Sequence, residues 1–297
     1  MNNPIIQING LSRQFGKKPA LDQINLEVTR GKVLGLVGEN GAGKTTLIKH
    51  LLGLYKAQRG SVQVFGLDPV KDPVGVLGRI GYLSENREMP EWMTVEQYIT
   101  YTRAFYPTWD SAFEKELTNQ FELDRKLKIK HLSRGQRAKL GLLVAMAYRP
   151  DLLLFDEPSS GLDPVVRRDM LGAIVRTIAE EGRTVVLSSH LLDEVERVAD
   201  SITMLHQGRV VLSDSLEHIR QEHHQFVIHF DEAQVHPPRL PGLLSYAGGP
   251  LEWSCLCRQE LGVLKKTTTE LNGRILDCCS PSLDDIFIAR VKAGTVD

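Results

Sequence analysis

A glycine-rich stretch at residues 38–45 constrains the fold of this chain more than any other feature. It matches the pattern G-x-x-x-x-G-K-[ST] at every fixed position and follows directly on the apolar run 33–37. Glycines allow a backbone to wrap closely around phosphate oxygens, and the N–H groups at the start of the following helix supply positive potential. A plain glycine turn between a strand and a helix is the alternative. The complete pattern in this context predicts a phosphate-binding loop within an α/β fold.

The side chains of this loop have specific expected roles. Lys44 would place its ammonium group against the β- and γ-phosphates of a nucleoside triphosphate, and the Thr45 hydroxyl would bind Mg²⁺. The residues expected to contact the nucleotide are Gly38, Glu39, Asn40, Gly41, Ala42, Gly43, Lys44, Thr45 and Thr46.

Short apolar runs alternate with helical patterns through the first two thirds of the chain. Strands are expected at 5–8, 24–28, 33–37, 152–155 and 184–187. Helices are expected at 45–54, 95–105, 137–148, 165–181 and 191–199. Because apolar runs of this length suit strands that are buried on both faces, the alternation predicts an α/β domain with a largely parallel sheet.

The alternation changes character at two places. In the first part of the region 86–150, helical patterns follow one another without a strand between them. We interpret the region of about 86–150 as a helical insertion into the α/β core. After residue 220 the expected elements are strands at 223–230 and 274–278 and a helix at 283–291. The sequence therefore predicts one domain over 1–220 and a small α+β domain over 221–297.

The composition is that of an ordinary globular chain. Lysine and arginine number 36 and aspartate and glutamate 37, so the net charge is −1, which argues against a protein that mainly coats DNA or RNA. At 42% hydrophobic residues, the chain can bury a sizeable core. No apolar run approaches the roughly 18 residues that cross a bilayer, and the start lacks the pattern of a secretory signal. We therefore expect a soluble, intracellular protein.

The four cysteines all lie near the C-terminus. Cys255 and Cys257 would share one face of a strand, whereas Cys278 and Cys279 would point to opposite faces. A metal site is conceivable, but the paired CxxC spacing of such sites is absent. Reduced or partly buried thiols are the favoured interpretation.

Two adjacent carboxylates end the apolar run 152–155. Asp156 at the end of the strand could orient Mg²⁺ through its water shell, and Glu157 could polarise an attacking water as a general base. A solvated sheet edge is the alternative for these two residues. The phosphate-binding loop elsewhere in the chain favours the functional interpretation.

A second anion site is expected at residues 131–136. Ser133 is of the type that caps helices, and Gly135 would expose backbone donors at the start of the next helix. An ordinary helix cap is the alternative. The position of this segment shortly before Asp156 favours a role in the same site.

Taken together and in their order along the chain, these motifs resemble those of the nucleotide-binding subunit of ATP-binding cassette (ABC) transporters. The resemblance covers residues 1 to about 220. The resemblance implies that residues 38–45 are the Walker A loop for ATP, and that Asp156 and Glu157 are Walker B with its catalytic glutamate. Residues 132–136 resemble the LSGGQ signature. The signature residues that would contact ATP are Ser133, Gly135 and Gln136.

Three further positions follow from the same resemblance. Residues 159–163 resemble the D-loop, in which Asp163 would approach the nucleotide. His190 would be the switch histidine of the catalytic site, and a surface histidine is the alternative. Phe15 lies where the family places an aromatic side chain that stacks on adenine, and a core aromatic is the alternative.

The chain departs from the family pattern at two positions. Glu85 stands where a Q-loop glutamine is usual, and its carboxylate can still face Mg²⁺ or its waters, although it adds negative charge beside the triphosphate. Arg134 replaces a glycine of the signature. Both changes, together with the tail at 282–287, resemble the ATPase subunits of ABC-2 type exporters.

The resemblance also implies partners. Cassettes of this family pair head to tail, so we expect a second ATPase subunit, identical or different, whose signature meets the ATP of the first. Opening of the pair after hydrolysis would drive an integral membrane permease subunit, and the chain would be cytoplasmic, on the inner face of the cell membrane. The permease would contact the helical insertion after Glu85.

Two other functions remain open at this point. The main alternative is a soluble ABC ATPase with a role linked to nucleic acid or the ribosome, although no direct contact with nucleic acid is expected. The residues after about 220 could also sense a ligand or a metal and regulate turnover.

Overall fold

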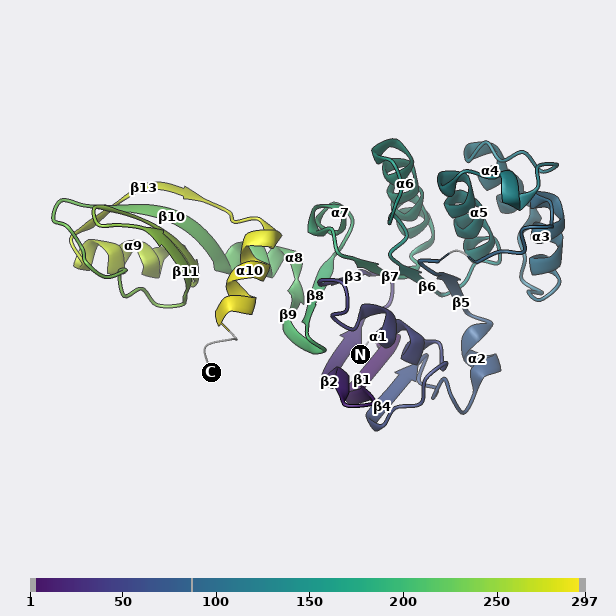
Figure 1. Ribbon diagram of the computed structural model, residues 1–297, viewed down its shortest axis with the longest axis horizontal. Helices are drawn as coiled ribbons and strands as arrows, with labels where there is room; N and C mark the ends of the chain where they lie inside the picture. The colour runs from purple at the N-terminus through teal and green to yellow at the C-terminus, as the bar shows by residue number, and fades with distance from the viewer. Residues whose placement is uncertain (1–3, 87, 294–297) are drawn as a thin grey trace. The chain divides into compact units, whose positions relative to one another are not determined.

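The computed structural model describes residues 4–86 and 88–293, and they form two compact units (Figure 1). Unit 1 contains the chain up to residue 199 together with 205–210, and unit 2 contains 200–204 and the chain from residue 211. The domain boundary predicted near residue 220 therefore lies within unit 2, which already includes the chain from residue 211.

A six-stranded sheet forms the centre of the α/β fold. Its strands are β3 (Val33–Val37), β5 (Ile80–Leu83), β6 (Leu152–Asp156), β7 (Thr184–Ser189), β8 (Ser201–His206) and β9 (Arg209–Ser215), in the order β5-β6-β7-β3-β8-β9. Each neighbouring pair from β5 through β6 and β7 to β3 is parallel. Because β3, β6 and β7 are buried at every residue, they appear in the sequence as continuous apolar runs. The predicted α/β fold with a mostly parallel sheet is confirmed.

An antiparallel sheet packs with this core in unit 1. Its strands are β1 (Ile6–Phe15), β2 (Lys18–Val28) and β4 (Arg59–Val64), in the order β2-β1-β4. Ile6, Ile8 and Leu26 from this sheet share a hydrophobic core with Leu36 and Leu47. The predicted strands at 5–8 and 24–28 match only the more buried halves of β1 and β2, since the other halves carry polar residues at exposed positions.

The helices of unit 1 include the five predicted ones and three further elements. They are α1 (Lys44–Leu51), α2 (Pro73–Leu77), α3 (Val95–Arg103), α4 (Ser111–Gln120), the 3-10 turn η1 (Ile129–His131), α5 (Arg134–Met146), α6 (Pro164–Glu181) and α7 (Leu192–Glu196). The three further elements are α2, α4 and η1. Helices α3 and α4 pack on α5, which in turn contacts β5, and Figure 1 shows these three helices grouped beyond that strand. They correspond to the predicted helical insertion. Capping boxes begin both α3, at Thr94 and Gln97, and α5, at Ser133 and Gln136.

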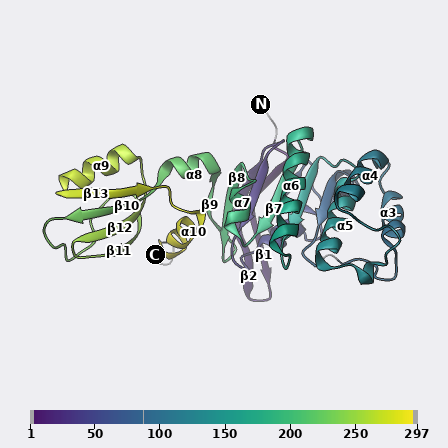
Figure 2. The same cartoon turned by 90° about the horizontal axis from the view of Figure 1, so that it is seen from above.

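Unit 2 is built around a four-stranded antiparallel sheet with one face covered by a helix (Figure 2). Its further elements are α8 (Leu216–Glu222), β10 (His223–Phe230), β11 (Leu243–Gly248), β12 (Glu252–Arg258), α9 (Leu261–Glu270), β13 (Gly273–Cys279) and α10 (Leu283–Ala293), and the strand order is β11-β12-β10-β13. Leu264 of α9 packs in a core with Phe226, Ile228 and Trp253.

The cysteines of unit 2 divide into two kinds. Cys255 and Cys257 share the core face of β12, and burial raises the pKa of Cys255 to about 11 and that of Cys257 to about 12, so both remain neutral thiols. Cys278 and Cys279 are exposed on β13. In the part of the chain that the structure describes, no group of three or more His, Cys, Asp or Glu side chains is placed to hold a metal ion.

None of the described helices combines the length and the apolar character that a membrane span requires.

Candidate active site

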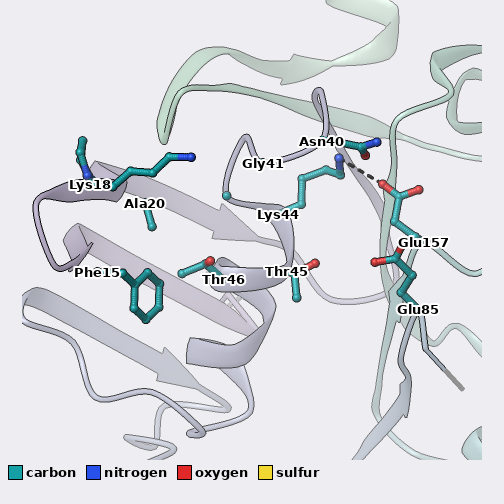
Figure 3. Close-up of a pocket in the computed structure, with 12 residues that line it drawn as sticks. Phe15, Lys18, Ala20, Asn40, Gly41, Lys44, Thr45, Thr46, Glu85 and Glu157 are labelled. Atoms are coloured by element: carbon teal, nitrogen blue, oxygen red, sulfur yellow. Dashed lines mark ion pairs between the residues drawn. The ribbon is translucent and has the colours of Figure 1, made fainter. Parts of the chain in front are cut away.

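A pocket of about 380 Å³ opens where the parallel strands of unit 1 end (Figure 3). The carboxyl ends of β3, β5, β6 and β7 lead into the four segments that carry the predicted chemistry, because parallel strands end at the same edge of a sheet. The pocket is lined by Phe15, Lys18, Pro19, Ala20, Asn40, Gly41, Gly43, Lys44, Thr45, Thr46, Glu85 and Glu157. In the view of Figure 3, Phe15 lies at one end and the two glutamates lie at the other.

The loop between β3 and α1 can take its path only with glycine at two of its positions. At Gly38, a Cβ atom would lie 2.3 Å from the carbonyl oxygen of Leu205. Gly43 has a φ of 113° and a Cβ there would lie 2.6 Å from the carbonyl oxygen of Ala20. The loop is therefore held close to neighbouring backbone, with its N–H groups and the start of α1 at the pocket.

Lys44 is buried at the centre of the pocket with oxygen atoms around its ammonium group. Nζ donates to the carbonyl oxygens of Gly38 at 2.5 Å and Glu39 at 3.2 Å, and it lies 3.1 Å from Oε1 of Glu157. Both charged side chains are 5% exposed. A phosphate that entered the loop would compete with Glu157 for this ammonium group.

The two adjacent carboxylates at the end of β6, Asp156 and Glu157, contact different partners. Ser188 Oγ donates to Oδ1 of Asp156 at 2.7 Å and accepts from the backbone N–H of Glu157 at 3.0 Å. Oε2 of Glu157 lies 2.7 Å from Nδ1 of His190. Glu157 has a φ of 49°, an uncommon backbone conformation for a non-glycine residue, and this turn separates its side chain from that of Asp156.

Asp156 has the properties of a metal-binding carboxylate. Its side chain is buried, and burial raises its pKa, although hydrogen bonds from Ser188 and Thr45 act in the opposite direction and the charge of Glu157 adds to the increase. A divalent cation would favour the ionised form. The carboxylate of Asp156, the hydroxyl of Thr45 and the carboxylate of Glu85 supply the hard oxygen ligands that Mg²⁺ prefers.

Phe15 is supported from behind by a small aromatic and cationic cluster. Phe15 is 43% exposed, and its ring meets that of Tyr55 edge to face at a centroid distance of 5.5 Å. The Arg13 guanidinium lies 4.8 Å from the Phe15 ring and 4.9 Å from the Tyr55 ring. Phe15 is thus available in the pocket for stacking and is not a core aromatic.

The signature segment lies elsewhere in unit 1. Ser133 is the N-cap of α5 and its Oγ accepts from the backbone N–H of Gln136 at 3.2 Å, while Ser133 and Gly135 remain partly or fully accessible. Asp163 uses one carboxylate oxygen to cap α6, accepting from the N–H groups of Val165 and Val166 at 3.1 Å. Residues 133–136 and Asp163 are not among the described residues that line the pocket.

Comparison with known proteins identifies the family. A family model described as "ABC transporter" matches residues 21–160. The uncharacterized ABC transporter ATP-binding protein YdbJ of Bacillus subtilis is 33% identical over 219 residues, which cover 73% of this chain and 71% of that protein. This chain belongs to the ATP-binding proteins of ABC transporters, and it is an ATPase.

Two further comparisons extend the match. The bacitracin transport ATP-binding protein BcrA of Bacillus licheniformis is 27% identical over 98% of this chain and 99% of its own length, so its similarity includes the region of unit 2. A solved structure of the ATP binding subunit of an ABC transporter covers 73% of this chain and 92% of its own, with a TM-score of 0.67 and 30% identity. The ABC fold predicted from the motifs is confirmed.

The structure of this ABC ATPase also reveals residues that sequence reasoning missed. Lys18, Pro19 and Ala20 line the pocket, but nothing in the local pattern distinguishes them from other strand residues. Ser188 lies between the predicted strand at 184–187 and His190, and no local pattern marks it as a partner of Asp156. Its position opposite Asp156 follows from the register of β6 and β7, which apolar runs do not specify.

Proposed function

We propose that this chain is the ATP-hydrolysing subunit of a multi-subunit ABC transporter, with a separate membrane permease, and that it belongs to the ABC-2 exporter type. The family and the resemblance of Glu85 and Arg134 to that branch support the proposal, as does the bacitracin transport named for BcrA. Residues 1–220 would be the ATPase domain and 221–297 an accessory domain. The location would be cytoplasmic, at the inner face of the cell membrane.

The distribution of the two anion sites is the observation that carries this proposal. The pocket holds the phosphate loop and Glu157 on one side, whereas the exposed donors of Ser133 and Gly135 lie outside its described lining. A second copy that turns its α5 N-terminus toward the pocket would supply the missing donors to the triphosphate. ATP would then join two ATPase subunits, which would share two composite sites.

The hydrolytic step would depend on groups already placed around the pocket. Glu157 would accept a proton from the attacking water, and His190, 2.7 Å away, would hold that carboxylate in position. Lys44 would leave Glu157 and contact the β- and γ-phosphates. Thr45, Asp156 and Glu85 would hold Mg²⁺, which neutralises phosphate charge when it is bound.

An apolar groove in unit 1 suits the permease contact. The groove has a volume of about 340 Å³ and is lined mainly by aliphatic and tyrosine side chains from the end of α1, α2, β5, α3 and α5. Leu54 at its rim is 62% exposed, and Tyr106 and Tyr148 stack inside it at 3.6 Å. An apolar helix face at the cytoplasmic end of a permease would bury these surfaces.

The experiment combines Glu157→Gln with a measurement of mass in solution. This variant should stop turnover and accumulate dimers when ATP and Mg²⁺ are present, while the parent should remain monomeric between turnovers. Hydrolysis at the parental rate would exclude Glu157 as the base.

The permease contact has a separate test. Leu54→Asp should leave the ATPase activity of the isolated chain unchanged and weaken its copurification with the proposed permease subunit. Unchanged copurification would remove the groove from the proposal.

A further inference from the structure

A buried carboxylate outside the pocket connects two of the segments that hold the reacting groups. Glu194 lies on α7, four residues after His190, and is 3% exposed. Its Oε2 accepts a hydrogen bond of 2.5 Å from Ser159 Oγ, and Ser159 itself is 3% exposed. Its Oε1 lies 2.8 Å from Nε of Arg167 on α6, a close ion-pair contact whose angle is outside hydrogen-bond geometry.

These contacts lie beside the pair formed by Glu157 and His190. The segment 156–159 and the segment 188–194 are joined at Asp156 by Ser188, at Glu157 by His190, and at Ser159 by Glu194. The last two contacts close a ring of chain, since one residue lies between Glu157 and Ser159 and three lie between His190 and Glu194. Glu194 therefore fixes the far side of the ring that holds the proposed base.

The backbone conformation of Glu157 needs the support that this ring of contacts provides. Its φ of 49° is a conformation that surrounding contacts must maintain, because a non-glycine side chain disfavours it. The side chain of His190 is 37% exposed, so packing does little to orient it, and its position depends on the backbone that leads into α7. A carboxylate as buried as Glu194 keeps its charge only with close partners, and Ser159 and Arg167 supply them.

We infer that Glu194 is a positioning residue for ATP hydrolysis, which holds Glu157 and His190 in register through Ser159. This inference rests on the proposed roles of Glu157 and His190. Arg167 also reaches the D-loop, where Nη2 donates to the carbonyl oxygen of Leu162 at 3.5 Å. The same carboxylate thus stabilises the D-loop and the segment of the switch histidine together.

The test separates positioning from folding by measuring turnover and ATP binding on the same variants. Glu194→Ala should lower kcat roughly 10- to 100-fold, as expected for a small misplacement of a reacting group, and leave the dissociation constant of ATP within about twofold of the parent. Ser159→Ala should lower kcat in the same direction, and the double variant should be no slower than Glu194→Ala. Asp193→Asn, on the exposed side of the same helix, is the matched control and should change neither quantity.

Glu194→Gln provides the conservative variant. Its amide oxygen can still accept from Ser159, so it should recover most of the kcat that Glu194→Ala loses, and it covers the case in which the alanine variant fails to fold. All rates are taken well below the melting temperature of each variant. Parental kcat in Ser159→Ala, or losses that multiply in the double variant, would overturn the inference, as would equal losses of kcat and ATP affinity.

A parallel measurement on Glu157→Gln separates this inference from the proposed function. If Glu157→Gln hydrolyses ATP at the parental rate, the proposed base is wrong. If Glu157→Gln is inactive while Ser159→Ala and Glu194→Ala are normal, the positioning role alone is wrong.

Discussion

Removal of the Glu157 charge should tighten ATP binding as well as stop turnover. Before ATP binds, Lys44 lies 3.1 Å from this carboxylate, and both side chains are 5% exposed. Coulomb's law at that distance, with an effective dielectric constant of about 20, gives an attraction of roughly 5 kcal/mol that a phosphate must replace. If removing the charge in Glu157→Gln spares ATP a quarter of this attraction between Lys44 and Glu157, the affinity of the variant for ATP rises about tenfold. The loss of repulsion between Glu157 and the triphosphate acts in the same direction.

The assay is equilibrium binding of ATP, with hydrolysis followed in the same samples. Glu85→Gln is the matched comparison, because it removes a charge from the same pocket and leaves the pair of Lys44 and Glu157 in place. Glu157→Gln should therefore bind ATP more tightly than Glu85→Gln does. Equal or weaker binding by Glu157→Gln than by the parent would refute the competition between Glu157 and phosphate.

Three other outcomes follow from the pocket. Phe15→Ala should raise the dissociation constant of ATP by roughly 5- to 150-fold, the range of about 1–3 kcal/mol for a stacked base, with little change in kcat, and Phe15→Trp should restore binding. Gly43→Ala should abolish nucleotide binding measured by fluorescence, since its Cβ would lie 2.6 Å from a carbonyl oxygen. The pKa of Asp156 is raised, so on acidification it loses its charge at a higher pH than an ordinary aspartate does. As the pH falls through that raised pKa, the Mg²⁺ concentration needed for half-maximal activity should rise. A Mg²⁺ requirement that does not change with pH would contradict the metal role of Asp156.

The parallel strands β3, β6 and β7 were predictable because each is a short apolar run, whereas β5, β8 and β9 of the same sheet were missed. The predicted strand at 33–37 coincides with β3, and those at 152–155 and 184–187 fall one and two residues short of the ends of β6 and β7. The strand β4 was missed, since Arg59, Gly60 and Ser61 begin it and give no alternation. In unit 2, β11 and β12 were missed for a related reason: the proline-rich loop before them conceals where pairing begins, and pairing is set by partners distant in sequence.

The site residues also fall into those that a contiguous sequence pattern predicts and those brought together by contacts between distant segments. The phosphate loop is contiguous, so its pattern alone placed Lys44 and Thr45 in one pocket. The contact of Glu157 with His190 joins residues 33 apart, and that of Ser159 with Glu194 joins residues 35 apart. Such contacts depend on the register of β6 and β7, which hydrophobic runs leave unspecified. Ser133 is not among the described residues that line the pocket, because the proposed arrangement brings it to the pocket of a second chain.

The central claim, that two copies share each ATP, has a direct test in mixed subunits. Lys44→Ala disables the phosphate loop, and Ser133→Asp puts a negative charge at the proposed phosphate contact of the signature while keeping a good helix cap. Each variant alone should be inactive. In an equimolar mixture, one site of every mixed dimer has both halves intact, so about a quarter of the parental activity should return if pairing is random. A mixture no more active than its separate components would contradict shared sites.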